Sequence, residues 1–264
     1  MMKQTPPARP QTERSDQTRA RILDAAVRQF SANGLAGART EQIAEEAGVN
    51  KALIYYYFSG KEALYKAALE SVAQGVLAAN MAVLEADASA GEKFLQSALN
   101  HFDRVHTNRG FQSLLQQEMV RLHRGEANAL TQLVETVFRP LMLKMGEVIA
   151  EGIASGELIA VDPAQIRYAA MGANVFYFLS APMMKMIQGT DPMSHDALDH
   201  YRNAAIAYLG LSIFVDRKHG AEVAAKVLKA TSMPKDSGTS THPFLQNHTA
   251  PKVRLTKTNG EPRS

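Results

Sequence analysis

Two short segments joined by a glycine constrain the fold of this chain more than any other feature. The first covers residues 40–47 and begins at Thr40, a residue type that caps helix starts. Its inward-facing positions, spaced as on one face of a helix, are Ile43, Ala44 and Ala47. Gly48 then supplies a tight corner, and Asn50 can cap a second short helix. Two short helices joined by a turn that contains glycine predict a helix-turn-helix, whose second helix enters the major groove of DNA.

The second helix of this motif presents two different faces. Ile54, Tyr57 and Phe58 recur at helical spacing and are expected to pack inward. The other face, which we expect to contact DNA, carries Lys51, Ala52, Tyr55 and Tyr56. A lysine can reach a guanine edge or a phosphate, an alanine can touch a thymine methyl group, and tyrosine hydroxyls can bond phosphates.

A further helix is predicted to begin at Lys61, where the free backbone N–H groups and the lysine side chain suit a phosphate. The distribution of charge along the chain also agrees with a polyanionic partner for this region. Residues 1–66 carry ten Lys and Arg against seven Asp and Glu, a net charge of +3. Residues 67–230 carry fourteen against seventeen, a net charge of −3, and residues 231–264 carry five against two, again +3. A basic head and a basic tail therefore flank an acidic body.

Helical periodicity without an alternating strand pattern extends over the rest of the chain and predicts an all-α protein. A first helix is expected to begin at Ser15 or Asp16 and to end at residues 33–34, which are Asn and Gly. Further breaks between helices are expected at residues 87–91, 124–125 and 155–156.

Two long helices are predicted in the C-terminal half of the body. The first begins with an Asp cap and a proline at residues 162–163 and is expected to reach residues 188–189. The second is expected to begin at Asp191 or Ser194 and to end at residues 217–220. The prediction for this end depends on Arg, Lys and His, which suit the negative end of a helix dipole, and on the glycine that follows them.

Composition divides the chain into four parts. Residues 1–14, rich in Pro, Gln and Arg, are expected to form a flexible arm. Residues 15–62 contain the helix-turn-helix, and residues 63–230 form the helical body. Residues 231–264, rich in Ser, Thr, Pro and Gly, are expected to be a disordered tail.

Composition also excludes several classes of protein. The chain has no cysteine, which excludes disulfide scaffolds, thiolate metal sites and cysteine nucleophiles. The first residues show no apolar run of the kind found in a signal peptide, so we expect a cytoplasmic protein. The uncharged stretch 168–184 contains Gly, Asn, Ser and Pro and is short for a membrane span, which favours a buried core or interface helix. Without a phosphate-binding glycine loop, a nucleophile elbow or a histidine metal motif, we expect no enzyme, no metal site and no cofactor.

The run T-x-x-I-A-x-x-A-G-V-x-x-x-x-x-Y-x-x-F-x-x-K resembles the DNA-binding signature of the tetracycline-repressor (TetR) family. The matching residues are Thr40, Ile43, Ala44, Ala47, Gly48, Val49, Tyr55, Phe58 and Lys61. The preceding helix also fits the family pattern with residues 22–26, Phe30 and Gly34, so that the close match spans about residues 18–66. One departure is Asn-Lys-Ala at residues 50–52, where Ser-x-Gly is common in the family. Because asparagine caps as well as serine, this departure bears on base preference rather than on the fold.

The resemblance implies a homodimeric, one-component transcriptional regulator, usually a repressor, whose three N-terminal helices bind double-stranded operator DNA. It implies that Thr40, Tyr56 and Lys61 contact phosphates, and that Lys51, Ala52 and Tyr55 face the groove. Further candidate contacts from the arm are Arg9, Arg14 and Arg19. It also implies an effector pocket in the body, a dimer interface from the last two long helices, and an effector-driven tilt of the helix that begins near Lys61. A dimer is favoured independently, since one short helix reads only a few base pairs.

Candidates for the small-molecule effector site are polar or aromatic residues on otherwise apolar helices of the body. They are His101, Phe102, Glu118, Arg121, Asn174, Phe176 and Tyr177, with Met142, Met145, Met171 and Met183 as possible lining. The alternative is that these aromatics and methionines belong to the core or to the dimer interface. Asn174 is the strongest candidate because a buried amide must find a partner. That partner could equally be the same residue across a dimer axis.

Two other classes of function remain open at this point. One is an α-helical enzyme with a vestigial helix-turn-helix, which would need a catalytic constellation that the sequence lacks. The other is a nonspecific binder of nucleic acid or of a membrane surface, which would need a larger and more clustered charge than +3.

Overall fold

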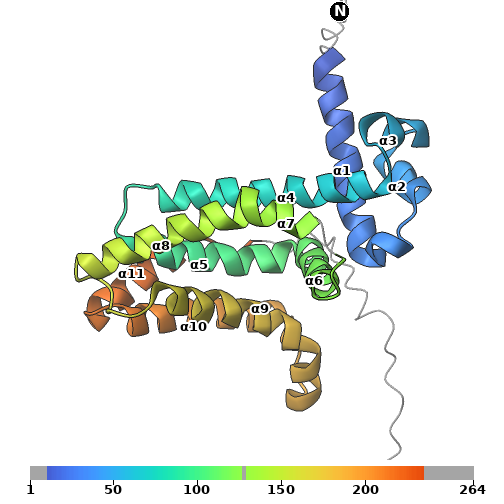
Figure 1. Cartoon of the computed structure of the whole chain (residues 1–264). Coiled ribbons are helices and arrows are strands. Elements are labelled where there is room, and N and C mark those ends of the chain that lie inside the picture. Colours follow the sequence, from blue (N-terminus) through green and yellow to red (C-terminus); the bar gives the residue numbers. More distant parts are fainter. Residues whose placement is uncertain (1–10, 127–128, 235–264) are drawn as a thin grey trace, which may run out of the picture.

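The computed structural model describes residues 11–126 and 129–234 of the chain (Figure 1). The described residues form helices and no strand; the only bridge of β type among them is an isolated pair, Leu158 and Phe214. The helices are α1 (Gln11–Gly37), α2 (Thr40–Ala47), α3 (Lys51–Tyr57), α4 (Lys61–Leu84), α5 (Ala90–Thr107), α6 (Arg109–His123), α7 (Ala129–Leu133), the π-helix η1 (Val134–Phe138), α8 (Arg139–Ala154), α9 (Pro163–Gln188), α10 (His195–Ile213) and α11 (Arg217–Ala230). The prediction of an all-α protein is confirmed.

The first three helices pack around a hydrophobic core that they share with α4, α6 and α7. Its central side chains are fully buried, and they include Ile22 and Phe30 of α1, Ile43 of α2 and Ile54 of α3. Near its end α1 kinks at Gly34, which has φ +67°, where the sequence predicted a helix end. In Figure 1, α2 and α3 lie together against α1, to one side of the remaining helices.

The long helix α4 connects this unit with the rest of the molecule. Its Tyr65 is buried and packs edge-on against Phe30 of α1, with ring centroids 5.0 Å apart. Further along, α4 contacts α5 and α8 of the body. Among the described residues, α4 is the one helix long and apolar enough to cross a membrane by length and composition. Its buried side chains belong to the protein core, and a core helix passes the same test.

The body is a layered bundle in which α5 lies against α8, α9, α10 and α11. Its core contains Phe94, Leu99, Met145, Ile149 and Phe214, all buried. Figure 1 shows the end of α9 extending beyond this bundle. Pro182 lies within that last part of α9.

Several predicted helix ends are confirmed. The side chain of Asp162 caps α9 by accepting from the backbone N–H of Ala164 at 2.8 Å, and α9 ends at Gly189 as expected. Ser194, rather than Asp191, caps α10. Two helix boundaries differ from the prediction. The N-cap of α2 is Arg39 rather than Thr40, so Thr40 is already the first residue of that helix. The break between α5 and α6 was not predicted.

The prediction that α10 ends at residues 217–220 is wrong. The helix ends at Ile213, and the cationic residues begin a separate helix, α11. The side chain of Asp216 caps α11 by accepting from the N–H groups of Lys218 and His219 at 2.8 and 3.2 Å. The helix α11 then folds back so closely that a Cβ at Gly210 would lie 2.5 Å from the carbonyl oxygen of Gly220.

Near both ends of the chain the observed boundaries differ from the predicted ones. The first helix begins at Gln11, earlier than Ser15 or Asp16, because residues 11–14 include good helix formers that follow Pro10. Residues 1–10 of the predicted arm and residues 235–264 of the predicted tail lie outside the described residues. Thr231 was assigned to the tail, but its carbonyl oxygen accepts from Arg202 Nη2 at 3.0 Å.

Candidate DNA-binding and effector sites

The corner between α2 and α3 has the geometry of a helix-turn-helix. Gly48 takes the left-handed conformation, with φ +64° and ψ +40°. This conformation allows the N–H of Val49 to donate to the carbonyl oxygen of Ala44 at 2.9 Å, which closes the end of α2. The side chain of Asn50 accepts from the N–H of Ala52 at 2.9 Å and caps α3, as predicted.

The two faces of α3 separate as the spacing predicted. Ile54 and the following Phe58 are buried, and Tyr57 packs partly buried against the same core. Tyr55 and Tyr56 are 50% and 79% exposed, which leaves their hydroxyls free to reach a ligand. Lys51 and Ala52 are exposed as well. A short helix that is anchored on one side therefore presents a lysine, an alanine and two tyrosines on the other.

Lys51 has a neighbour that the sequence pattern did not reveal. Its Nζ donates a hydrogen bond to Glu41 Oε1 on α2, and it lies 5.7 Å from the centre of the Tyr55 ring. The hydrogen bond lowers the pKa of Glu41 and raises the pKa of Lys51, so both groups are held charged at neutral pH. An acidic residue in the first turn of α2 was the only sequence signal for this pair.

The candidate phosphate contacts lie in three different environments. Thr40 is buried in the first turn of α2, where its hydroxyl donates to Glu41 Oε2 at 3.4 Å. Lys61 is half-buried, and its Nζ donates to the carbonyl oxygen of Ala36 at 3.0 Å, linking α4 with the end of α1. Arg19 is exposed and its guanidinium lies 5.5 Å from the centre of the Phe58 ring. Arg9 and the side chain of Arg14 lie outside the described residues.

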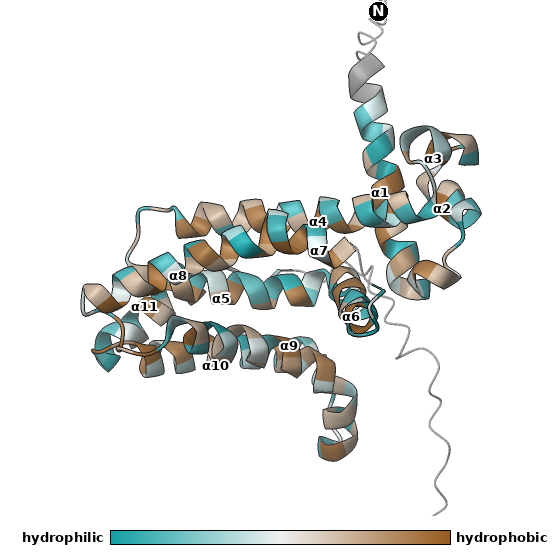
Figure 2. Ribbon diagram, viewed as in Figure 1, coloured by the Kyte–Doolittle hydropathy of each residue, from teal (hydrophilic) through white to brown (hydrophobic). Residues whose placement is uncertain are grey.

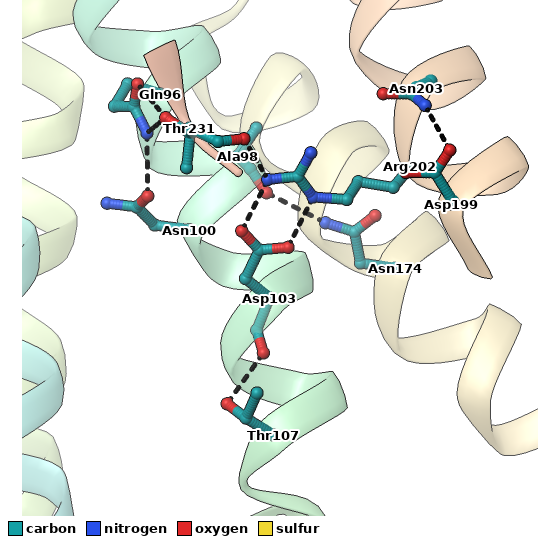
Figure 3. Close-up of polar contacts among 10 residues, drawn as sticks. All are labelled: Gln96, Ala98, Asn100, Asp103, Thr107, Asn174, Asp199, Arg202, Asn203 and Thr231. Carbon is teal, nitrogen blue, oxygen red and sulfur yellow. Dashed lines mark hydrogen bonds and ion pairs between the residues drawn. The ribbon is translucent and has the colours of Figure 1, made fainter. Parts of the chain in front are cut away.

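One group of effector candidates comes together between α5, α9 and α10. Asn174 is buried, and its Nδ2 donates to the carbonyl oxygen of Ala98 at 3.2 Å (Figure 3). The same Nδ2 lies 3.4 Å from His101 Nδ1. Phe102 is buried beside Tyr177, whose hydroxyl donates to the carbonyl oxygen of Pro192 at 2.6 Å. The amide of Asn174 thus finds its partners within the chain.

Burial controls the protonation of His101. Burial, together with the nearby positive charge of Arg104, lowers the pKa of His101 to about 4. The imidazole is therefore neutral at physiological pH. Close by, Arg202 donates to Asp103 at 2.7 and 2.9 Å and ties α10 to α5 (Figure 3).

A second group of candidates lies apart from the first, where α4 meets α6. Glu118 is fully buried, and its Oε1 accepts from the hydroxyl of Tyr65 at 2.9 Å and from Arg121 Nη1 at 2.6 Å. Burial and the hydrogen bond to Glu118 both raise the pKa of Tyr65. Tyr65 was not among the predicted site residues, because its partner is 53 positions away in the sequence.

Phe176 belongs to neither group. It is 61% exposed on the outer face of α9, whereas Asn174, two residues earlier, is buried on the opposite side of that helix. Other large apolar residues share this exposure on α9 and α10: Tyr168, Leu179, Met183, Met186, Ile187, Tyr208 and Leu211. Figure 2 shows hydrophobic colouring along α9 and on its free end. The other suggested lining residues, Met142, Met145 and Met171, pack in or against the core of the body.

These features define a class of protein: a helix-turn-helix DNA-binding protein with a separate helical C-terminal domain. The family model for bacterial regulatory proteins of the tetR family matches residues 22–68, and that for the tetracyclin repressor-like C-terminal domain matches residues 93–208. The chain belongs to the TetR family and is a DNA-binding regulator of transcription, not an enzyme.

Relatives and solved structures agree with this family. The transcriptional regulator RutR of Escherichia coli is 29% identical over 170 residues, which cover 64% of this chain and 77% of RutR. The repressor SCO4008 of Streptomyces coelicolor is 51% identical over 53 residues, 20% of this chain and 28% of that protein. A transcriptional regulator from Saccharomonospora viridis, solved in complex with choline, shares the fold with a TM-score of 0.59 and 19% identity, over 76% of this chain and 100% of that one.

Proposed function

We propose that this protein is a homodimeric repressor that binds palindromic operator DNA and is released by a small-molecule effector bound in its C-terminal helical domain. The observation that carries the proposal is the exposed face of α3, with Lys51, Ala52, Tyr55 and Tyr56 on a helix anchored by Ile54. Lys51, Ala52 and Tyr55 read the groove, and Thr40, Tyr56 and Lys61 bind phosphates. We assign the DNA-binding domain to residues 15–62 and the regulatory domain to residues 63–230.

The exposed apolar face of α9 and α10 supports the homodimer. Tyr168, Phe176, Leu179 and Met183 follow one another at helical spacing on α9, each at least half exposed. A contiguous apolar face of this kind marks an association surface. Pairing with the same face of a second copy gives a four-helix bundle and a closed two-fold dimer. Such a dimer places two copies of α3 on successive half-sites of the DNA, about 34–36 Å apart.

The C-terminal domain supports a role in sensing a small molecule. Polar groups inside its helical bundle, above all the buried Asn174 and the neutral, half-buried His101 beside it, are the kind of groups that orient a ligand in an apolar site. The Saccharomonospora viridis regulator of similar fold was solved with choline, which supports a small-molecule site in this chain. A regulator of this type acts where the chromosome is, in the cytoplasm of a bacterial cell.

The proposal is tested with duplex DNA from the region upstream of the protein's own gene. Fluorescence anisotropy compares this duplex with a scrambled duplex of the same length and base composition while the salt concentration is varied. We expect tighter binding to the upstream duplex and a loss of affinity with rising salt for both. Equal affinity for both duplexes at every salt concentration would contradict the proposal.

A further inference from the structure

A cleft opens at the junction between the DNA-binding unit and the body. It has a volume of about 1330 Å³ and is lined by residues 33–36 at the end of α1, by the first turns of α4 and by α6. The side chain of Gln117 reaches from α6 towards the kink in α1, so that a Cβ at Gly34 would lie 3.1 Å from its Oε1. A molecule in this cleft would therefore touch both helices that lead into the DNA-binding unit.

The charged residues that line the cleft are three cations and two anions. The cations are Lys61, Lys66 and Arg121, and the anions are Glu62 and Glu126. Lys61 already donates to a backbone carbonyl oxygen, whereas the exposed side chain of Lys66 has no hydrogen-bond partner among the described residues. The lining thus carries a small positive excess, with one free ammonium group.

Arg121 is held in an incomplete pair. A guanidinium has five N–H donors and usually binds a carboxylate with two of them. Here Arg121 and Tyr65 both donate to Oε1 of Glu118, while the buried Oε2 of Glu118 has no hydrogen-bond partner in the described part of the chain. The Arg121 side chain is 26% exposed and lines the cleft, so its remaining N–H groups are available to a ligand.

We propose that this cleft binds a small organic anion whose acidic group accepts hydrogen bonds from Arg121 of α6 and Lys66 of α4. The bound anion clamps α4 to α6 beside the bridge from Tyr65 to Glu118. Because Tyr65 also packs on Phe30 of α1, the clamp fixes the angle between the DNA-binding unit and the body. This regulatory consequence rests on the proposed function, whereas binding of the anion does not.

Binding is tested on the full-length protein without DNA. Calorimetry measures succinate, benzoate and inorganic phosphate, with choline and acetamide as cationic and neutral probes. We expect at least one anion to bind the wild-type protein, and binding to weaken about tenfold in Lys66→Gln, since a charge-assisted hydrogen bond is lost. Lys218→Gln, an exposed lysine on α11 at the other end of the molecule, is the matched control and should bind like the wild type.

Arg121→Met alone would leave Glu118 as an uncompensated buried charge and could unfold the protein. The paired variant Glu118→Gln with Arg121→Met removes both charges, and thermal melting checks that it is folded. We expect it to lose anion binding as well. The proposal is overturned if no anion binds the wild-type protein, if choline or acetamide binds instead, or if Lys66→Gln and the paired variant both bind like the wild type.

Measurement of operator binding separates this proposal from the proposed function. The anion should change the DNA affinity of the wild-type protein, and the same change in Lys66→Gln should need about ten times more anion. If the protein binds the anion and shows no preference for upstream DNA, the proposed function fails and the cleft remains a ligand site. If it prefers upstream DNA and binds no anion, only the cleft proposal fails.

Discussion

Two faces of the molecule stay exposed although each carries large side chains, and their chemistry differs. The face of α3 presents Lys51, Tyr55 and Tyr56, which combine positive charge and hydroxyl groups with flat apolar rings. The face of α9 and α10 presents Leu179, Met186 and other side chains without charge. The first composition suits a polyanion with apolar base edges, and the second suits another copy of the same apolar face.

In the proposed function the two faces have different tasks: the face of α3 contacts DNA, and the face of α9 and α10 forms the dimer. The proposed function needs both faces, because a single α3 reads too few base pairs for a selective site. A change on the α9–α10 face should therefore remove operator binding without touching any DNA contact, and a change on α3 should alter DNA binding without changing the oligomeric state. The following predictions test this separation, beginning with the largest effect.

Leu179→Glu should convert the protein into monomers. It places a charge in the centre of the proposed interface, where an unpaired buried charge costs about 3–5 kcal/mol, so operator affinity should fall by about a hundredfold or more. Sedimentation velocity and anisotropy measure the two effects. The control is Leu143→Glu, since Leu143 of α8 is just as exposed but lies off this face. A Leu179→Glu protein that remains dimeric would contradict the assignment of the interface.

Phe30→Ala should destabilise the hydrophobic core on which the exposed face of α3 depends. Phe30 is fully buried and packs edge-on against Tyr65, so its truncation should cost about 3–5 kcal/mol in the free energy of unfolding. Urea denaturation measures this cost. Met119→Ala, on an exposed position of α6, should change stability by less than about 0.5 kcal/mol. Similar values for the two variants would show that the core around Phe30 is not packed as described.

Stability should fall on acidification because of His101, which lies beneath the apolar face. Its pKa is about 4 in the folded protein and 6.5 when unperturbed, so the unfolded chain binds the proton more readily. The stabilisation is complete above pH 6.5 and is lost as the pH falls to 4, by at most about 3 kcal/mol. Urea denaturation at several pH values should show a smaller loss for His101→Gln than for the wild type. Identical pH profiles would contradict the burial of His101.

Lys51→Ala and Lys61→Ala should affect DNA binding in different ways. Lys51→Ala should change sequence preference and weaken operator binding by about tenfold, because a groove contact is lost. Lys61→Ala should weaken binding to all sequences and reduce the salt slope by about one. Anisotropy with operator and scrambled duplexes at several salt concentrations distinguishes the two. The assignment of the α3 face is wrong if both variants bind like the wild type.

Glu41→Gln should have the smallest effect, a few-fold gain in DNA affinity. Glu41 is exposed and holds Lys51 in an ion pair that DNA must break, and exposed pairs of this kind are weak. The gain should disappear in the Lys51→Ala background, and a gain that persists there would show that Glu41 does not act through Lys51.

The sequence predicts the α3 face well and the body poorly, for a physical reason. Gly48, Asn50 and Ile54 determine the corner, the cap and the buried side of α3 through contacts with close neighbours in the chain. By contrast, Tyr65 meets Glu118 across 53 positions, and Asn174 meets Ala98 across 76. Such pairs depend on how whole helices pack, which helical periodicity does not specify.

The misplaced end of α10 has the same origin. Cationic residues followed by Gly220 are typical of a helix C-terminus, but the cap of Asp216 makes them the first turn of α11. The chain breaks earlier because Phe214 leaves the helix to pair with Leu158, a contact between distant segments. The split of the predicted effector residues into two groups likewise depends on which helices become neighbours.

The number of protein copies on one operator is the most direct test that two reading faces act together through a dimer. Mass photometry of the full-length protein on the upstream duplex measures this number. We predict two copies per duplex, with no population carrying a single copy, and the absence of such complexes on the scrambled duplex at the same concentration. A stable complex of one copy on the upstream duplex would contradict the homodimeric mode of operator binding.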